Sequence, residues 1–242
     1  TDIVIVDVNA LSLNALSGGR DVSVSAGTTA TMLGAMTVAQ DLSIAAGTLA
    51  TGGFDLTVTR DILGAGTLSA TNAVNVGRSF APGAFTANSS TVTFNTAAVA
   101  TAGSYTFFNL VINKAASTDT VTATGAWTVT NALTLTRGTW DAGAALTHMV
   151  AGNWSSAAAN FVFAETTSTI RLTTAGATIT TKGLADTFWD LVIDNGATLA
   201  SAVGAANDLT VTTGSLALAN LSLTVGRHLT GGAGSSVDAT AG

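Results

Sequence analysis

A five-residue pattern returns at regular intervals along the chain. A valine and any second residue are followed by two residues that are mostly polar and then by a large apolar residue. From Val38 to Val58 is 20 residues, from Val58 to Val76 is 18, and the later gaps of 74 and 75 residues each fit about four such steps. Self-similarity at a step of about 19 residues indicates a solenoid, in which each repeat forms one turn. The five occurrences are VAQDL at Val38–Leu42, VTRDI at Val58–Ile62, VGRSF at Val76–Phe80, VAGNW at Val150–Trp154 and VGRHL at Val225–Leu229.

Apolar and polar residues alternate along these repeats, which predicts strands. In DVSVSAG at Asp21–Gly27 and DLSIAAG at Asp41–Gly47, alternate residues are apolar and share one face of a strand. The final glycine lets the chain turn into the next side, and no stretch has the period of a helix. We therefore predict an all-β fold, a right-handed parallel β-helix (β-solenoid) of about 12–13 turns of about 19 residues. At about 4.8 Å per turn, the rod would be about 60 Å long.

A longer repeat is superimposed on the short one. TFFNLVIN at Thr106–Asn113 returns as TFWDLVID at Thr187–Asp194, 81 residues later. About four turns make a block of this length. We predict one β-solenoid domain over residues 1–242, with no linker, built from blocks at about 2–108, 109–189 and 190–242. The first block is longer by about one turn and the third is shortened.

The order of these motifs resembles a known kind of repeat. LTLTRGTW at Leu133–Trp140 is followed by VAGNW, by STI at Ser168–Ile170 and by TFWDLVID. This order resembles the β-helical, filamentous-haemagglutinin-like repeats of large bacterial surface proteins and adhesins. The resemblance implies a parallel β-helix, export to the cell surface or the exterior, and a role in attachment or scaffolding. It implies no catalytic residue.

Composition narrows the classes of partner. Only 9% of the residues are charged, against about 25% in ordinary soluble domains, so short polar residues must cover the surface. The net charge is −6 and the basic residues are scattered singly, so nucleic acid is not an expected partner. The chain has no cysteine, which excludes disulfides and thiolate metal sites. No apolar run reaches the ~18 residues of a spanning helix, so the chain is not expected to span a membrane.

The alternation also predicts which side chains point into the solenoid. Residues at the inward phase should stack on their equivalents in neighbouring turns and form ladders. Trp154 takes the repeat position of Leu42, so it is expected in the core as well. The predicted inward residues are Leu42, Ile44, Leu56, Val58, Ile62, Val76, Phe80, Leu133, Leu135, Leu191, Ile193, Leu209 and Val211.

Neither a metal site nor a cofactor site is expected. His148 and His228 lack the spacing of a metal motif, and we expect both at the surface. Asp190 and Asp194 flank one strand and should point outward together, which leaves a calcium pair as an alternative. The calcium-binding solenoid signature is absent, and the capping of strand ends explains these acids more simply.

We do not expect an enzyme. A sugar-cleaving β-helix needs a cluster of acids and bases, with paired carboxylates about 5–10 Å apart, in a groove on one face. The acids here stand singly at strand starts, and no long insertion could wall a cleft.

Two binding functions remain as alternatives. Threonines at alternate positions should face outward, and if stacked they could form an ice-binding array, although β propensity alone explains abundant threonine. These pairs are Thr57 with Thr59, Thr128 with Thr130, Thr134 with Thr136, and Thr210 with Thr212. An adhesin stalk of the same fold could bind a cell-surface glycan through aromatic residues, here Tyr105, Trp127, Trp140, Trp154 and Trp189. In an exported protein, the N-x-S triplets at Asn88, Asn153 and Asn220 could accept a glycan.

The two ends of the sequence predict self-assembly. The chain opens in the strand DIVIVDV and closes in GSSVDATAG, whose Ser235–Val237 resembles the start of a repeat strand. If a second copy followed Gly242, the step from Val225 to its Asp2 would be 19 residues, about one turn short of the 40 between Val150 and Asp190. Uncapped ends of a β-solenoid recruit further strands. The predicted interface comprises Asp2, Ile3, Val4, Ile5, Val6, Ser235, Ser236 and Val237.

These features favour a non-enzymatic structural subunit of an extracellular filament or cell-surface scaffold. Its expected partner is the chain itself, stacked head to tail as a homo-oligomer or filament, because a heterologous contact that does not close propagates into a fibre.

Overall fold

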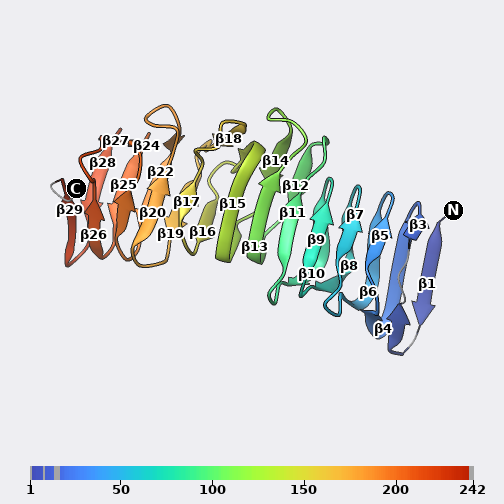
Figure 1. Cartoon of the computed structure of the whole chain (residues 1–242). Helices are drawn as coiled ribbons and strands as arrows, with labels where there is room; N and C mark the ends of the chain where they lie inside the picture. The colour runs from blue at the N-terminus through green and yellow to red at the C-terminus, as the bar shows by residue number, and fades with distance from the viewer. Residues whose placement is uncertain (1, 8, 14–16, 240–242) are drawn as a thin grey trace.

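The computed structural model describes residues 2–7, 9–13 and 17–239 and consists of strands that run across a long rod (Figure 1). The N-terminus lies at one end of the rod and the C-terminus at the other (Figure 1). The strand pairs are parallel. No helix that could cross a membrane is present in the described part of the chain. The predicted all-β parallel solenoid is therefore confirmed.

The strands found in the described residues are β1 (Ile3–Asp7), β2 (Leu11–Leu13), β3 (Ser17–Gly19), β4 (Val22–Met32), β5 (Met36–Val38), β6 (Leu42–Ala50), β7 (Leu56–Val58), β8 (Ile62–Ser69), β9 (Ala73–Val76), β10 (Phe80–Thr86), β11 (Thr91–Phe94), β12 (Ala100–Ala102), β13 (Tyr105–Asn113), β14 (Thr120–Ala123), β15 (Trp127–Asp141), β16 (Thr147–Val150), β17 (Trp154–Ser155), β18 (Phe161–Ala164), β19 (Thr169–Leu172), β20 (Ala177–Thr180), β21 (Thr187–Phe188), β22 (Asp190–Ile193), β23 (Ala197–Leu199), β24 (Val203–Ala205), β25 (Asp208–Val211), β26 (Gly214–Ala217), β27 (Leu223–Val225), β28 (His228–Gly231) and β29 (Ser235–Asp238).

Each turn of the solenoid has three sides. In the C-terminal half, β22, β23 and β24 form one turn, and each pairs with its counterpart in the next turn, β25, β26 and β27. In the N-terminal half, some strands bend round a corner and serve two sides. The first half of β4 pairs with β1, and its last three residues pair with β2. The cross-section is therefore a triangle, with the core inside it.

The rod has about 11 turns with a spacing of about 20 residues, fewer than the predicted 12–13 turns of about 19. Leu42 pairs with Ile62, a step of 20 residues. Phe80 pairs with Ala102, a step of 22, and Ile112 with Leu135, a step of 23. Extra residues at the corners of the middle turns lengthen the step, so fewer turns fit into the chain.

The predicted core is confirmed almost completely. Of the thirteen residues predicted to point inward, twelve are buried, and several form ladders such as Leu42, Ile62 and Phe80. Leu133 is only half-buried, although it packs against the core. Its segment of β15 pairs backward with β13, but the described residues supply no partner for Leu133 on the C-terminal side. One neighbour in the ladder is thus missing.

Aromatic rings form a continuous column inside the middle of the rod. The rings of Trp127 and Trp140 are stacked with centroids 5.2 Å apart, and those of Trp140 and Trp154 lie 5.8 Å apart. The column runs from Phe80 at one end to Phe188 at the other through successive ring contacts. The three tryptophans are at most 1% exposed, so the prediction of a core position for Trp154 is confirmed.

Glycine permits a close approach of backbones at the corners. Gly47 has a φ of +71°, and a Cβ there would lie 2.3 Å from the carbonyl oxygen of Ala26 in the preceding turn. Gly64, with a φ of +116°, approaches the carbonyl of Ile44 in the same way. Only glycine tolerates both the left-handed backbone and the missing space. The predicted turning role of the glycine after DLSIAA is explained by this contact.

Candidate functional site

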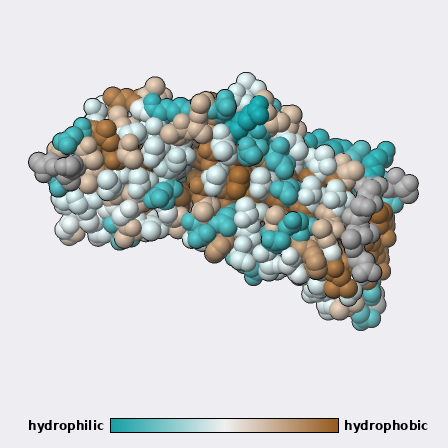
Figure 2. Space-filling model, viewed as in Figure 1, coloured by the Kyte–Doolittle hydropathy of each residue, from teal (hydrophilic) through white to brown (hydrophobic). Residues whose placement is uncertain are grey.

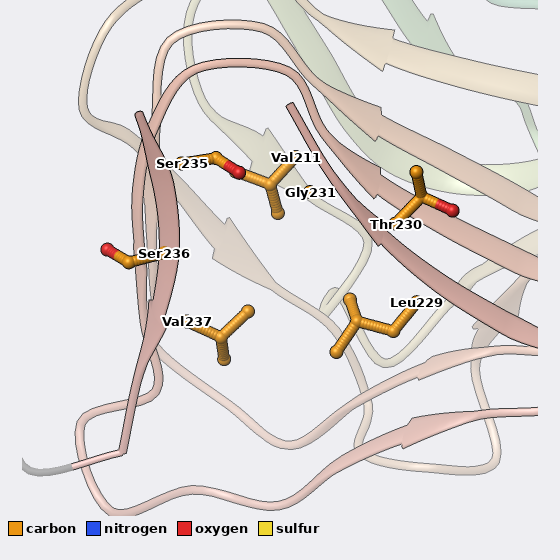
Figure 3. Close-up of a pocket in the computed structure, with 7 residues that line it drawn as sticks. All are labelled: Val211, Leu229, Thr230, Gly231, Ser235, Ser236 and Val237. Carbon is orange, nitrogen blue, oxygen red and sulfur yellow. The ribbon is translucent and has the colours of Figure 1, made fainter. Parts of the chain in front are cut away.

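In the described part of the chain, core positions become exposed at the C-terminal end of the solenoid. Leu209 and Leu216 are fully buried one turn earlier, whereas the residues stacked on them, Leu229 and Val237, are 52% and 39% exposed. A cavity of about 210 Å³ opens between β28 and β29, and Leu229 and Val237 lie on opposite sides of it (Figure 3). The cavity is lined by Val211, Leu229, Thr230, Gly231, Ser235, Ser236 and Val237. Among the described residues, this cavity is where the apolar interior is exposed at the end of the rod.

The N-terminal end of the rod is apolar as well. Ile3 and Ile5 of β1 point inward, are half-buried and pack against the core. Val4 and Val6 point outward and are 71% and 70% exposed, where the next turn has Ser23 and Ser25. Hydrophobic surface gathers at this end of the rod in Figure 2. Within the described residues, β1 pairs with β4 on one side only.

The structure thus places the predicted interface residues at two opposite ends. Asp2–Val6 lie at the N-terminal end, and Ser235–Val237 line the C-terminal cavity (Figures 1 and 3). The two groups do not meet within one chain. Leu229, Thr230 and Gly231 belong to the same end face but were absent from the predicted interface. Leu229 is the final apolar residue of the VGRHL repeat, and this position in the motif could have indicated that it belongs to the end face.

Aspartates at strand starts cap the neighbouring turn. The side chain of Asp21 accepts the backbone N–H of Asp41, and Asp41 accepts that of Asp61. Asp61 in turn accepts the N–H of Ser79 and pairs with Arg78. Burial raises the pKa of Asp61, but these hydrogen bonds outweigh it and hold the pKa below its ordinary value. The acids serve the turn-to-turn stacking.

Asp190 repeats this arrangement in the C-terminal half, where it accepts the backbone N–H of Asp208 at 3.0 Å. The capping role predicted for Asp190 is confirmed. The Asp194 carboxylate instead accepts a hydrogen bond from Nε of Arg171. No group of three or more His, Cys, Asp or Glu side chains capable of holding a metal occurs in the described ranges. His228 is exposed beside Asp208, as predicted.

The surface prediction for His148 is wrong, because this residue is fully buried in the aromatic column. It has the same phase in β16 as the inward Val150, and it stacks on Ile170 of the next turn. Nδ1 accepts the backbone N–H of Trp127, so Nε2 carries the proton and donates to the carbonyl of Ala142 at 2.7 Å. Burial lowers the pKa of His148. The imidazole is a neutral core group with both nitrogens satisfied.

Lys114 is a buried lysine that the sequence reasoning did not single out. It is 1% exposed and reaches back along the interior, where Nζ donates to the carbonyl oxygen of Gly77 at 3.1 Å. The hydroxyl of Thr96 donates to the same oxygen at 2.6 Å. Burial lowers the pKa of Lys114 to about 8, and the nearby Asp119 opposes the shift. The lysine spans a wide corner between β9, β11 and β13.

Replacing Lys114 by methionine should remove a pH dependence of stability. In the wild type, the unfolded lysine holds its proton up to about 10.5 while the folded one loses it at about 8, so the free energy of unfolding rises with pH in that window. Below pH 8 the burial of the charge opposes folding. Lys114→Met should match or exceed the wild-type stability at pH 7, because Thr96 still satisfies Gly77. Urea unfolding from pH 7 to 10 measures this, and an equal slope in both proteins would contradict it.

The threonine pairs face outward as expected but do not form a continuous array in the described residues. Thr57 lies between Thr37 and Asn75, and Thr134 lies beside Val111. Among the aromatic residues considered for sugar stacking, Trp127, Trp140 and Trp154 are buried in the core, where a sugar could not reach them. Trp189 is half-buried.

Comparisons with protein-family models, with curated proteins and with solved structures found no match. A proposal for the function therefore has to be argued from the structure itself.

Proposed function

We propose that this protein is a non-enzymatic structural β-solenoid that stacks end to end in an extracellular filament or cell-surface scaffold. The observation that carries the proposal is the partial exposure of inward-facing apolar side chains at both ends of the described rod, Ile3 and Ile5 at one end and Leu229 and Val237 at the other. Exposed strand edges bind further strands unless something covers them. A further turn at either end would bury this surface as each internal turn does.

The roles of individual polar residues support a scaffold. Asp21 and Asp41 cap the next turn, and the buried His148 and Lys114 are held by hydrogen bonds within the fold. Contacts between unlike ends propagate rather than close, so the expected assembly is a filament. Short polar residues along the sides would keep the filament soluble.

A charge at the open C-terminal end should block assembly. Leu229→Lys would place an ammonium group where the next turn must stack, and the cost of burying it without a partner opposes the contact. Thr210→Lys is the control, because Thr210 lies one turn earlier on β25, points outward and is not part of the end face. Analytical ultracentrifugation and electron microscopy of the purified chain should show filaments for the wild type and for Thr210→Lys, and monomers for Leu229→Lys.

Circular dichroism and melting of the two variants check that both remain folded. A wild-type chain that stays monomeric at high concentration would contradict the proposal. Filaments of normal length from a folded Leu229→Lys variant would exclude the C-terminal end as the contact.

A further inference from the structure

The winding of the solenoid specifies where a following strand belongs. β24 pairs with β27, three strands later, so a strand that continued the winding after β29 would lie on β27. The first turn of the chain contains β1, β2 and β3 in this order, and β4 then returns to pair with β1. A second copy that continues the winding would therefore lay β1 on β27, β2 on β28 and β3 on β29.

The inward residues of the C-terminal strands distinguish this setting from its two rotations. Both inward positions of β27, Leu223 and Val225, are apolar and half-buried. β1 likewise has two apolar inward residues, Ile3 and Ile5, so each would meet an apolar partner. The other two strands offer β1 only one apolar position each: β28 presents Leu229 and Gly231, and β29 presents Ser235 and Val237.

From this convergence we infer that the stacking partner is a second copy of this chain, seated in one rotational setting with Ile3 and Ile5 on Leu223 and Val225. The second strand of that copy brings Leu11 and Leu13 over Leu229 and closes the cavity between β28 and β29. This inference rests on the proposed end-to-end stacking and adds the identity of the partner and its register.

Cysteine pairs test the register directly, because the native chain has no cysteine. Val4 points outward on β1, while Thr224, Thr230 and Ser236 point outward on β27, β28 and β29. Neighbouring parallel strands lie about 4.8 Å apart, within reach of a disulfide or a short bifunctional thiol reagent. The three variants are Val4→Cys with Thr224→Cys, Val4→Cys with Thr230→Cys, and Val4→Cys with Ser236→Cys.

Under oxidising conditions that permit assembly, the Thr224 pair should give a ladder of covalent oligomers, and the other two pairs should remain mainly monomeric on denaturing gels. Val4 and Thr224 lie at opposite ends of one rod, so any link joins two molecules (Figure 1). Each single-cysteine variant is the control and can give at most a dimer.

The outcomes separate this inference from the proposed function. If the wild type forms filaments but the Thr230 or Ser236 pair gives the ladder, or no pair does, the register is overturned while stacking stands. If the wild type does not assemble and no pair links, both are overturned. A ladder from the Thr224 pair alone supports both.

Discussion

Replacing Ile62 by aspartate should lower the free energy of unfolding by roughly 3–5 kcal/mol, the range for an uncompensated buried charge. Ile62 is fully buried and lies in the inward ladder between Leu42 and Phe80. A carboxylate there would have apolar neighbours above and below and no cationic partner. Urea unfolding monitored by circular dichroism gives the change directly.

Leu63→Asp is the matched control for this prediction. Leu63 is the next residue on β8, points outward and is 37% exposed, so its carboxylate stays in water. We expect a loss of less than about 1 kcal/mol, as for most surface substitutions. Because each turn is stabilised mainly by its neighbours, damage at Ile62 should spread to adjacent turns, which hydrogen exchange would detect. Equal midpoints for the two variants would show that the assigned inward phase is wrong.

Truncating Trp140 to alanine should cost about 3–5 kcal/mol, as for other large aromatic residues in cores. Its ring contacts Trp127 at 5.2 Å, Trp154 at 5.8 Å and His148 at 5.2 Å, so the substitution interrupts the aromatic column in its middle. The near-ultraviolet circular dichroism of the stacked tryptophans should change as well.

Trp140→Phe provides the comparison. The indole Nε1 of Trp140 is buried without a hydrogen-bond partner, so phenylalanine removes an unsatisfied donor while keeping much of the ring. Its loss of stability should be clearly smaller than that of Trp140→Ala. If alanine and phenylalanine destabilise equally, ring packing is not the source of the effect.

The straight sides of the solenoid were predictable from the sequence, and its corners were not. Along a strand, the period of two fixes which side chains point inward, so Leu42, Ile44 and their equivalents could be assigned residue by residue. The same rule places His148 inward with Val150. The error arose because the imidazole was judged by its polarity, although backbone groups of Trp127 and Ala142 satisfy both nitrogens.

At the corners the sequence pattern has less predictive power. Lys114 is the residue after β13 and keeps the inward phase of Leu110 and Ile112, but its charge and its place beyond the strand gave no reason to assign it to the interior, where it reaches Gly77. Inserted corner residues also explain why the turn count was overestimated. The ends were located from the strand motifs, whereas the exposure of Leu229 and the cavity beside it depend on how three sides close around the core.

The direction of the hydrogen bonds determines how the rod would carry a mechanical load. Strands run across the long axis, so the ladder bonds lie along it, and a pull on the two ends would act on every turn-to-turn interface in series (Figure 1). Rupture under tension is then set by the weakest interface. β15 shares eight partner pairs with β13 and three with β14, but only two with β16 and four with β18. The rings of Trp140, Trp154 and Phe163 span that thinner interface, so under tension the aromatic column would supply cohesion where the ladders are short.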